Sequence, residues 1–444
     1  MPVRNNEWRT YYQLSIEDLV QAQQIFHSDL IERQNVVATA VGKYRARRRG
    51  VPMSEAKTIE NSTVNRNSYP ALLVFVDLWK HPSQFKKKHI SEFVPQVITL
   101  PDRRKVPTCV LLVEPEKVVP PPLYQRLNFP TSLMGGGFPI IRPSQAEDRA
   151  GSMGCLVTDG AYVYGLTNRH VAGSGKEAIH TFVNGNRVEI GMCDDRQVTK
   201  AEIDKAFPGF AVSKGWMAPV TFTNVDAGLI RIADVTQWTA QVYGIGEVGE
   251  LFDLSADTLS TEIIGRPVCA FGAASGNLRG EIQGLFYRYK TVGGYGYVSD
   301  LLIGPRPGES MNTVPGDSGT VWFLEDTESR GTNAPCLRPI AMQWGGHVFG
   351  SSSRGRYRLA LATALSTILR ELDLDIVSDW NVGNNEYWGK VGHYKVATSA
   401  VSMVGGPLGS LLSANLGNIS FADDEIAAGM AKKQRGVSRG RSTK

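Results

Sequence analysis

The sequence predicts a mainly β fold that is preceded by a small α/β domain. The chain has 444 residues, too many for one ordinary hydrophobic core, so two or three folding units are expected. From about residue 128 to residue 379, short apolar runs alternate with glycine-containing turns at close intervals, as in antiparallel barrels or a sandwich. The 46 glycines of the chain also favour turns over long helices.

Residues 1–118 are expected to form the small α/β domain. Ser15 can cap a helix that has Glu17 and Asp18 in its first turn, and apolar residues follow at helical spacing as far as Ile31. Three later apolar runs are predicted to be strands, namely residues 71–78, 93–100 and 108–113. One helix with three strands makes a small α/β unit.

A basic stretch, Lys43–Arg49, ends the helical region. Contact with nucleic acid is one interpretation, but a solvated turn or helix end is favoured because no interleaved aromatic residues accompany the cations. Much of the remaining basic charge lies in the tail from Lys432 to Lys444, and the net charge is only +5. The charge balance therefore argues against a nucleic-acid surface that covers the whole protein.

The Pro-rich residues 119–127 are expected to be a stiff connector to a domain at 128–379. In that domain a closing helix is predicted at 359–374, where leucines and isoleucines recur at helical spacing. Residues 380–444 would be a C-terminal extension whose last dozen or so residues are basic and disordered. The predicted strands of the domain are residues 154–157, 162–166, 187–190, 227–232, 267–271, 284–289, 297–303, 319–324 and 339–344.

Cysteine usage and the lack of apolar segments indicate a cytoplasmic protein. The five cysteines are an odd number without close pairs, which fits neither a disulfide framework nor a zinc motif and favours a reducing compartment. The first thirty residues contain four acidic side chains and no continuous apolar run, unlike a secretory signal. The most apolar stretch, Val401–Leu416, is short and interrupted by glycines, so no membrane span is expected.

Three segments carry the residues of a nucleophilic site. Ser318 lies between two glycines in residues 314–320, His170 lies in the Thr-Asn-Arg-His-Val-Ala segment, and Asp226 lies in Asp-Ala-Gly-Leu-Ile. The order is His, Asp, Ser, with spacings of 56 residues (226 − 170) and 92 residues (318 − 226). That order is typical of chymotrypsin-type serine proteases and differs from the order in other triad folds.

The chemistry explains why these residue types are needed together. A serine hydroxyl is a weak nucleophile, so Ser318 needs a base, His170, and the base needs an orienting acceptor, Asp226. Gly316 has no side chain to block a positive φ, so the backbone N–H groups of Gly316 and Ser318 can converge as an oxyanion hole. The sequence therefore predicts a catalytic triad with its oxyanion loop.

Each residue alone has a more ordinary interpretation. A single histidine such as His170 is more often packed or on the surface than catalytic, and Asp226 could cap a turn. Gly-Asp-Ser-Gly is also a common turn composition. Only the three flanking patterns, in this order and at these spacings, favour catalysis over those alternatives.

The three motifs resemble the trypsin-like protease superfamily, which has the two-barrel chymotrypsin fold. Further segments are similar to the plant narrow-leaf trypsin-like proteins and their bacterial relatives. These segments are Gly244–Glu250, Ile264–Val268, Ala274–Gly276, Trp344–Gly346 and Leu372–Leu374. The resemblance runs from about Gly154 to Asp379, and more weakly over the N-terminal domain. It implies an intracellular serine protease without secretion.

The chain departs from the pattern of the secreted relatives at several positions. Val171 stands where those relatives carry a disulfide cysteine, and Thr320 replaces a second glycine after the serine. No processing site is evident that would free an α-amine for Asp317, so activation by cleavage is doubtful. The specificity position six residues before the nucleophile is Asn312 (318 − 6), a neutral residue. The resemblance thus implies a specificity pocket at Asn312, Trp344 and Gly345 without a preference for Lys or Arg.

The predicted function is serine endopeptidase activity on proteins or peptides through an acyl-enzyme. Two alternatives stay open: a catalytically silent scaffold or binding protein with the protease fold, and nucleic-acid binding through the basic tail and Lys43–Arg49. No cofactor, metal site or membrane partner is predicted, because no phosphate loop, paired metal-ligand motif or Rossmann fingerprint occurs. The sequence leaves homo-oligomerisation, the natural substrate and the regulation of activity open.

Overall fold

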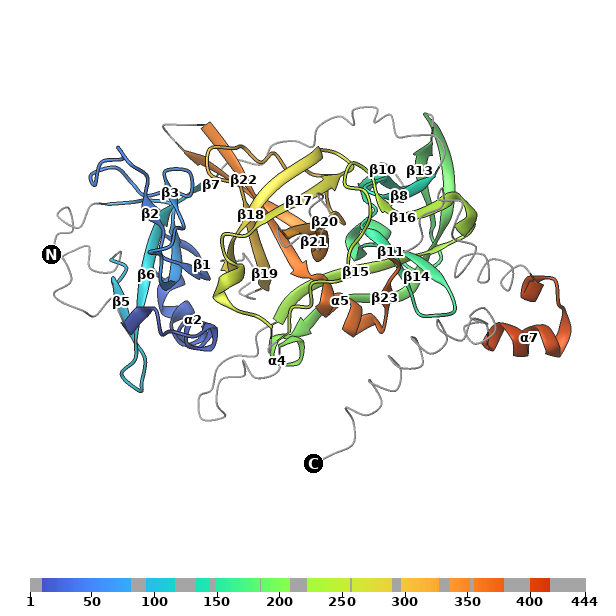
Figure 1. Cartoon of the computed structure of the whole chain (residues 1–444), viewed down its shortest axis with the longest axis horizontal. Coiled ribbons are helices and arrows are strands. Elements are labelled where there is room, and N and C mark those ends of the chain that lie inside the picture. Colours follow the sequence, from blue (N-terminus) through green and yellow to red (C-terminus); the bar gives the residue numbers. More distant parts are fainter. Residues whose placement is uncertain are drawn as a thin grey trace.

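The computed structural model describes eleven stretches of the chain. They are residues 10–80, 93–115, 133–143, 148–183, 185–207, 222–255, 258–289, 297–326, 336–351, 355–378 and 400–415. The expected connector at 119–127 and the basic tail lie outside the described residues. Within them, strands dominate and the predicted mainly β fold is confirmed (Figure 1).

The N-terminal part consists of a helix on a small sheet. Helix α2 (Ile16–Ile31) begins at Ser15, whose side chain accepts from the Asp18 N–H while the Asp18 carboxylate accepts from the Ser15 N–H, a capping box. The helix packs on strands that run in the order β1, β4, β6 and β5. Their bounds are β1 (Val36–Lys43), β4 (Pro70–Val76), β6 (Lys105–Leu112) and β5 (Val97–Thr99). Strand β1 was not predicted.

The basic stretch Lys43–Arg49 is not a solvated turn or helix end throughout. It contains the end of β1 and the short strand β2 (Ala46–Arg47), which pairs with β3 (Ser62–Thr63). The Arg45 side chain is only 2% exposed, so that prediction was wrong for this residue. Its guanidinium donates to the Ser62 hydroxyl and to two backbone carbonyls, which compensate for the loss of hydration.

The first barrel is a closed ring of six antiparallel strands. The chain from β10 (Asp148–Ser152) to β11 (Cys155–Thr158) acts as one bent strand that pairs with β9 at one end and β12 at the other. The ring closes through β9–β13, β13–β14, β14–β15 and β15–β12. The other bounds are β9 (Pro139–Pro143), β12 (Val163–Asn168), β13 (Ala178–Val183), β14 (Asn186–Glu202) and β15 (Phe222–Ile232).

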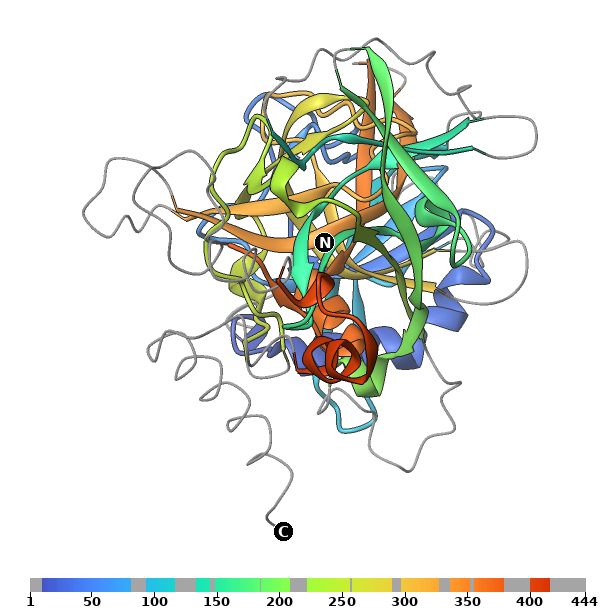
Figure 2. The same ribbon diagram turned by 90° about the vertical axis from the view of Figure 1, so that its right-hand side faces the viewer.

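The second barrel is also a closed ring of six antiparallel strands, in the order β17, β18, β19, β22, β21 and β20. Two closed barrels of this kind confirm the predicted two-barrel fold. Figure 2 looks onto the first barrel, with the second behind it. The bounds are β17 (Pro267–Gly272), β18 (Gly276–Tyr289), β19 (Tyr297–Gly304), β20 (Val321–Asp326), β21 (Cys336–Ser351) and β22 (Gly355–Ala364).

The closing helix is shorter than the predicted 359–374. Residues 355–364 form β22, and only Leu365–Leu372 form helix α5. Leu361 fits a helical spacing with Leu365, but β21 and β19 flank residues 360–362 on both sides and impose an extended backbone. Leu361 on one face of the strand and Ala360 and Ala362 on the other are all buried, as in a strand covered on its two faces.

Short elements complete the described residues. They are β7 (Glu114–Pro115), β8 (Met134–Gly136), α3 (Arg169–Ala172), α4 (Ile203–Ala206), two 3₁₀ turns (Val235–Gln237 and Thr261–Ile263), β16 (Trp238–Val242), β23 (Asp375–Ile376) and α7 (Gly406–Ala414). Helix α7 projects from the side of the molecule opposite the N-terminal part (Figure 1). No helix in the described ranges combines the length and the apolar character that crossing a bilayer requires.

The three parts of the molecule are joined by strands and by a buried carboxylate. Strand β1 adds to β18 of the second barrel, with Val41 opposite Leu285. Between the barrels, Asp300 on β19 accepts from the Thr223 hydroxyl of β15 and from the Ala364 N–H at the start of α5. Burial raises the pKa of the Asp300 carboxyl to about 6 despite these bonds. The barrels therefore share a polar contact that both must form.

Candidate active site

His170 and Asp226 are brought together by two neighbouring strands. His170 lies in the single turn α3, directly after β12, and Asp226 lies within β15, which pairs with β12. The Asp226 carboxylate accepts from the His170 backbone N–H at 3.1 Å, and its other oxygen lies 2.5 Å from His170 Nδ1. In the neutral imidazole this contact requires the proton on Nδ1, so Nε2 is left as the acceptor.

The backbone around Asp226 is shaped for this contact. Asp226 has a φ of 46°, a left-handed conformation that aspartate tolerates better than most residues. Two residues later, a Cβ on Gly228 would lie 3.0 Å from both the Arg169 Cα and the Ala172 Cβ. Glycine at 228 therefore lets the turn that carries His170 sit directly on β15.

Ser318 lies in the loop that leads into β20 of the second barrel. Its neighbours Gly316 and Gly319 have φ values of 105° and 97°, which a side chain would strain. The loop is fixed to β21 by bonds between Gly319 N–H and the Gln343 carbonyl and between Gln343 N–H and the Thr320 carbonyl, both 2.8 Å. The serine is thus held between two turns of fixed geometry.

Ser152 of the first barrel ties this loop to the strand that carries His170. Its N–H donates to the Ser318 carbonyl at 2.7 Å and its hydroxyl donates to the Gly316 carbonyl at 3.0 Å. Its own carbonyl accepts from Thr167, three residues before His170. A Cβ on Gly319 would lie 2.4 Å from the same Thr167 hydroxyl. The serine loop and the histidine turn therefore pack against the same short segment.

In the described part of the chain, the Ser318 hydroxyl and the His170 ring are not joined by a hydrogen bond. The histidine turn and the serine loop both approach Gly151, where an added Cβ would lie 2.5 Å from the Val171 side chain and 2.9 Å from the Ser318 carbonyl. Bonds of this kind are often long without substrate and tighten when it binds. The His170 side chain is 48% exposed, so it can be approached from solvent.

The two expected oxyanion donors are available. Among the described residues, the N–H groups of Gly316 and Ser318 have no hydrogen-bond partner in the protein. The carbonyls of the same two residues are both used by Ser152. The loop therefore turns its carbonyls inward and leaves the N–H groups for another acceptor.

Asp317 is fully buried, and five hydrogen bonds surround its carboxylate. The donors are the N–H groups of Ala274, Ser275 and Val314 and the hydroxyls of Ser275 and Thr313, at 2.6–3.2 Å. All five donors are neutral and belong to the second barrel. A buried carboxylate with several such donors is satisfied without a cationic partner.

Of the three residues predicted for the specificity pocket, Asn312 contacts this cage directly. Asn312 is exposed, and its carbonyl lies 2.8 Å from the Ser275 hydroxyl, whose single proton it shares with the Asp317 carboxylate. Trp344 and Gly345 follow Gln343, whose amide donates to Thr313 at 2.6 Å. A Cβ on Gly345 would meet no atom within 4 Å, so the space beside it is open.

Ser152, Ser275, Thr313 and Gln343 were not singled out from the sequence. Ser152, Ser275 and Gln343 lie 166, 43 and 25 residues from Ser318, Thr313 lies five residues before it, and none of the four stands in a recognisable local motif. Only the Ala-Ser-Gly segment that contains Ser275 was noted, without a role. In the described residues, no group of three or more His, Cys, Asp or Glu side chains is arranged to hold a metal.

Sequence comparison finds one matching family model and two named relatives. A family model described as the Nal1 C-terminal domain matches residues 131–380. A probable serine protease of Bradyrhizobium tropiciagri is 37% identical over 438 residues, covering 93% of this chain and 55% of the relative. Protein NARROW LEAF 1 of Oryza sativa subsp. japonica is 26% identical over 255 residues, covering 52% of this chain and 41% of the relative. The resemblance to narrow-leaf proteins is confirmed.

The chain spans about half the length of the curated relatives it matches. Among solved structures, Thermobifida fusca protease A is 17% identical and covers 55% of this chain and 97% of its own, with a TM-score of 0.33. A serine protease specific for glutamic acid is 13% identical and covers 55% of this chain and 99% of its own, with a TM-score of 0.35.

Proposed function

The chain belongs to the family of the Nal1 C-terminal domain, and on that premise we propose that it is a serine endopeptidase. The observation that carries the proposal is the 2.5 Å contact between His170 Nδ1 and Asp226 Oδ2, beside the segment on which the Ser318 loop packs. His170 would be the base, Asp226 its orienting acceptor and Ser318 the nucleophile.

In the first half of the reaction, the Ser318 Oγ attacks the peptide carbonyl carbon while His170 Nε2 takes the hydroxyl proton. The imidazolium that forms is stabilised by the Asp226 carboxylate on Nδ1. The carbonyl oxygen becomes negative and accepts from the N–H groups of Gly316 and Ser318. His170 then gives its proton to the leaving amine, the C–N bond breaks, and an acyl ester remains on Ser318.

In the second half, a water molecule attacks the acyl carbon and His170 takes its proton. The tetrahedral intermediate uses the same two N–H donors, and its collapse returns the proton to the Ser318 oxygen. Each such donor contributes about 3–4 kcal/mol of transition-state stabilisation. Neither N–H group has a hydrogen-bond partner among the described residues, which supports their role as oxyanion donors.

Covalent labelling tests the proposal directly. The full chain is expected to react with a fluorophosphonate probe at one site, and Ser318→Ala should abolish the adduct because the attacking oxygen is gone. Intact-mass spectrometry and peptide mapping would measure the adduct. Ser54→Ala, at an exposed position far from the site, is the matched control and should label fully. An unlabelled but correctly folded wild-type chain would count against the proposal.

We expect the chain to be catalytically active without N-terminal cleavage, because neutral donors already surround Asp317. In a loop held by an ion pair to a freed α-amine, cleavage would be needed to form the oxyanion donors. Here five neutral donors already satisfy the carboxylate. We therefore propose that the labelled species is the unprocessed chain, which the same intact-mass measurement identifies.

Ser275→Ala is expected to lower kcat/KM by about tenfold or more, the worth of one hydrogen bond to a charged group. The Ser275 hydroxyl joins the Asp317 carboxylate to the Asn312 carbonyl, so its loss loosens the oxyanion loop. Steady-state kinetics with a chromogenic ester should show the loss mainly in kcat, and Ser275→Thr should recover part of it. A change confined to KM would assign Ser275 to substrate binding instead.

Two further features are proposed on the same basis. Asn312, Trp344 and Gly345 would line the pocket for the residue before the cleaved bond, and the neutral Asn312 supports a preference other than Lys or Arg. The protein would act in a reducing compartment such as the cytoplasm. The cysteines whose side chains are described are free thiols, which supports that location. The substrate would be a protein or peptide.

A further inference from the structure

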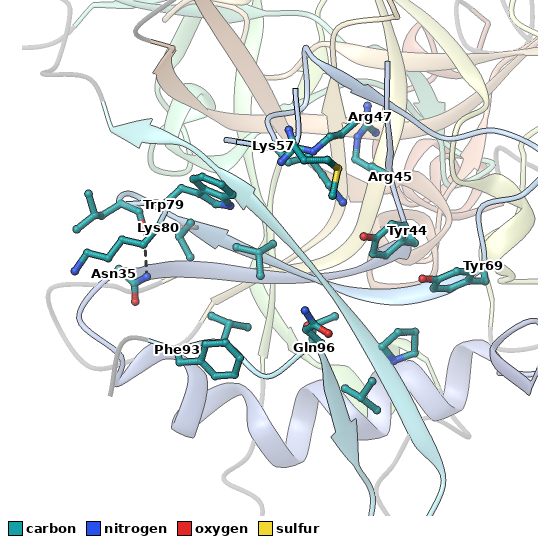
Figure 3. Close-up of a pocket in the computed structure, with 18 of the residues that line it drawn as sticks. Asn35, Tyr44, Arg45, Arg47, Lys57, Tyr69, Trp79, Lys80, Phe93 and Gln96 are labelled. Atoms are coloured by element: carbon teal, nitrogen blue, oxygen red, sulfur yellow. Dashed lines mark hydrogen bonds between the residues drawn. The ribbon is translucent and has the colours of Figure 1, made fainter. Parts of the chain in front are cut away.

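The N-terminal part contains a cavity whose lining residues, between Tyr11 and Val110, include none of the candidate active site. Its volume is about 460 Å³, within the usual range of ligand pockets (Figure 3). Aromatic side chains line it at Tyr44, Tyr69, Trp79 and Phe93. Four cations also line it and no Asp or Glu does, so the cavity favours an anionic ligand with apolar parts.

Two of the four cations are suitably placed to bind an anion. The Nη1 atom of Arg47 is buried and has no hydrogen-bond partner among the described residues, while the charge of Glu55, which does not line the cavity, acts on Arg47 from nearby. The Lys57 side chain is 8% exposed, and its Nζ lies 3.6 Å from the Cys109 sulfur and 4.0 Å from the centre of the Tyr44 ring. Neither of these contacts neutralises the ammonium. A carboxylate between Arg47 and Lys57 would satisfy both groups.

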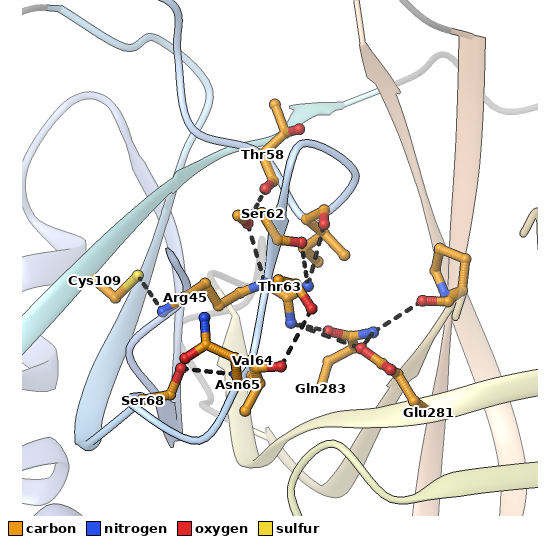
Figure 4. Close-up of polar contacts among 12 residues, drawn as sticks. Arg45, Thr58, Ser62, Thr63, Val64, Asn65, Ser68, Cys109, Glu281 and Gln283 are labelled. Atoms are coloured by element: carbon orange, nitrogen blue, oxygen red, sulfur yellow. Dashed lines mark hydrogen bonds and ion pairs between the residues drawn. The ribbon is translucent and has the colours of Figure 1, made fainter. Parts of the chain in front are cut away.

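Arg45, a third cation, is occupied by the protein itself. Figure 4 shows its guanidinium directed at Ser62 and at Gln283 of β18. It also lies 3.9 Å from Glu281. Arg45 therefore fixes the wall of the cavity to the second barrel and leaves Arg47 and Lys57 for a ligand.

The edge of β6 is open inside the cavity. Thr108 N–H donates to the Gln96 carbonyl and Leu112 N–H donates to the Lys57 carbonyl, both on the side of β6 away from β4. Because alternate residues of a strand point the same way, Val110 between them turns its N–H and C=O to the same side. In the described residues that N–H has no partner. Val110 lines the cavity.

Asn35 adds an acceptor that also lacks a partner. The residue is only 7% exposed, and its Nδ2 donates to the Leu78 carbonyl at 3.2 Å. Its Oδ1 atom is buried and unbonded within the described part of the chain. An orphaned buried acceptor costs free energy unless a ligand supplies a donor such as a peptide N–H.

We propose that this cavity binds the C-terminal segment of an extended peptide. Its carboxylate lies between Arg47 and Lys57, its last residue pairs with Val110 through main-chain N–H and C=O groups, and its apolar side chains pack among Trp79 and Phe93. A peptide is favoured over a small aromatic acid because Val110 offers a main-chain donor and acceptor together, which another backbone matches. The site is independent of the proposed Ser318 chemistry.

Binding can be measured by fluorescence polarisation on the full-length Ser318→Ala chain, which excludes turnover. The probe is a fluorescein-tagged pool of pentapeptides with four randomised positions and a C-terminal Phe, Leu or Val. The free-acid pool is expected to bind at least about tenfold more tightly than the C-terminal amide pool, since the amide loses its charge. Equal binding of the two pools, or no binding of either, would overturn the proposal.

Arg47→Gln should reduce the preference for the acid to less than about threefold, with an unfolding midpoint within about 2 °C of the parent. Lys57→Gln should act in the same direction, so the test does not depend on one variant folding. Arg49→Gln, at an exposed position outside the cavity, is the matched control and should bind like the parent. An unchanged preference in both Arg47→Gln and Lys57→Gln would exclude this carboxylate site. Competition by phenylacetate as strong as by the peptide would exclude the peptide class.

Discussion

Replacing Asp226 by Asn is expected to lower kcat/KM by about 10⁴-fold while the protein stays folded. The carboxylate oxygen 2.5 Å from His170 Nδ1 accepts a hydrogen bond from the Nδ1–H group, whereas an amide NH₂ in its place would donate and force the proton onto Nε2. In that tautomer His170 cannot take the proton from Ser318. The rate of fluorophosphonate labelling should fall in parallel with ester hydrolysis.

Asp234→Asn provides the matched control for this experiment. Asp234 is an exposed aspartate that follows β15 and caps a 3₁₀ turn. Its variant should keep the activity of the wild type. If Asp226→Asn retained more than about a tenth of the wild-type rate, the role of Asp226 as the orienting acceptor would be wrong.

The largest effect on stability is expected from Arg45→Met, with a loss of about 3–5 kcal/mol in the free energy of unfolding. Arg45 is buried beside Glu281, whose side chain is 10% exposed, so removing the cation leaves a buried carboxylate without its nearby charge. The carbonyls of Ile59 and Ser62 also lose their donor. Denaturant unfolding at pH 7.5 would measure the change.

The loss in the free energy of unfolding caused by Arg45→Met should become smaller as the pH falls from 7.5 to 5. Burial already raises the pKa of Glu281, and Arg45 opposes that rise, so the variant raises it further. A carboxyl with a raised folded-state pKa contributes stability below its unfolded pKa and loses it as the pH rises through the folded value. Lys43→Met is the control, since its partner Glu262 is 84% exposed and the pair contributes little. A pH-independent deficit would mean that Glu281 is not the source of the cost.

Most of the fold could be predicted because its signals are local. Apolar runs bounded by glycine turns predicted strands in both barrels, and Ser15 with Asp18 predicted where α2 begins. The errors arose where distant partners decide the backbone. Leu361 fits a helix with Leu365, but β19 and β21 hold it in a strand, and Val36–Lys43 becomes a strand because β4 and β18 flank it.

The candidate site could be predicted only in part, for the same reason. His170, Asp226 and Ser318 stand in motifs, and the structure joins the first two directly. Ser152 and Ser275 position the loop through hydrogen bonds from distant parts of the chain, and no pattern around either residue indicates that role. Arg45 was assigned to a solvated stretch because a basic run gives no sign of which cation is buried.

The addition of β1 to the second barrel also bears on how the chain folds during synthesis. Val41 pairs with Leu285, so 244 residues (285 − 41) must be made after β1 before its partner exists. At ribosomal rates of about 5–20 residues per second, that interval is roughly 12–50 s. Through this time one edge of β1 lacks its partner strand, and an unpaired edge is a template for wrong pairing between nascent chains. The N-terminal sheet must therefore be kept from self-association until the second barrel emerges.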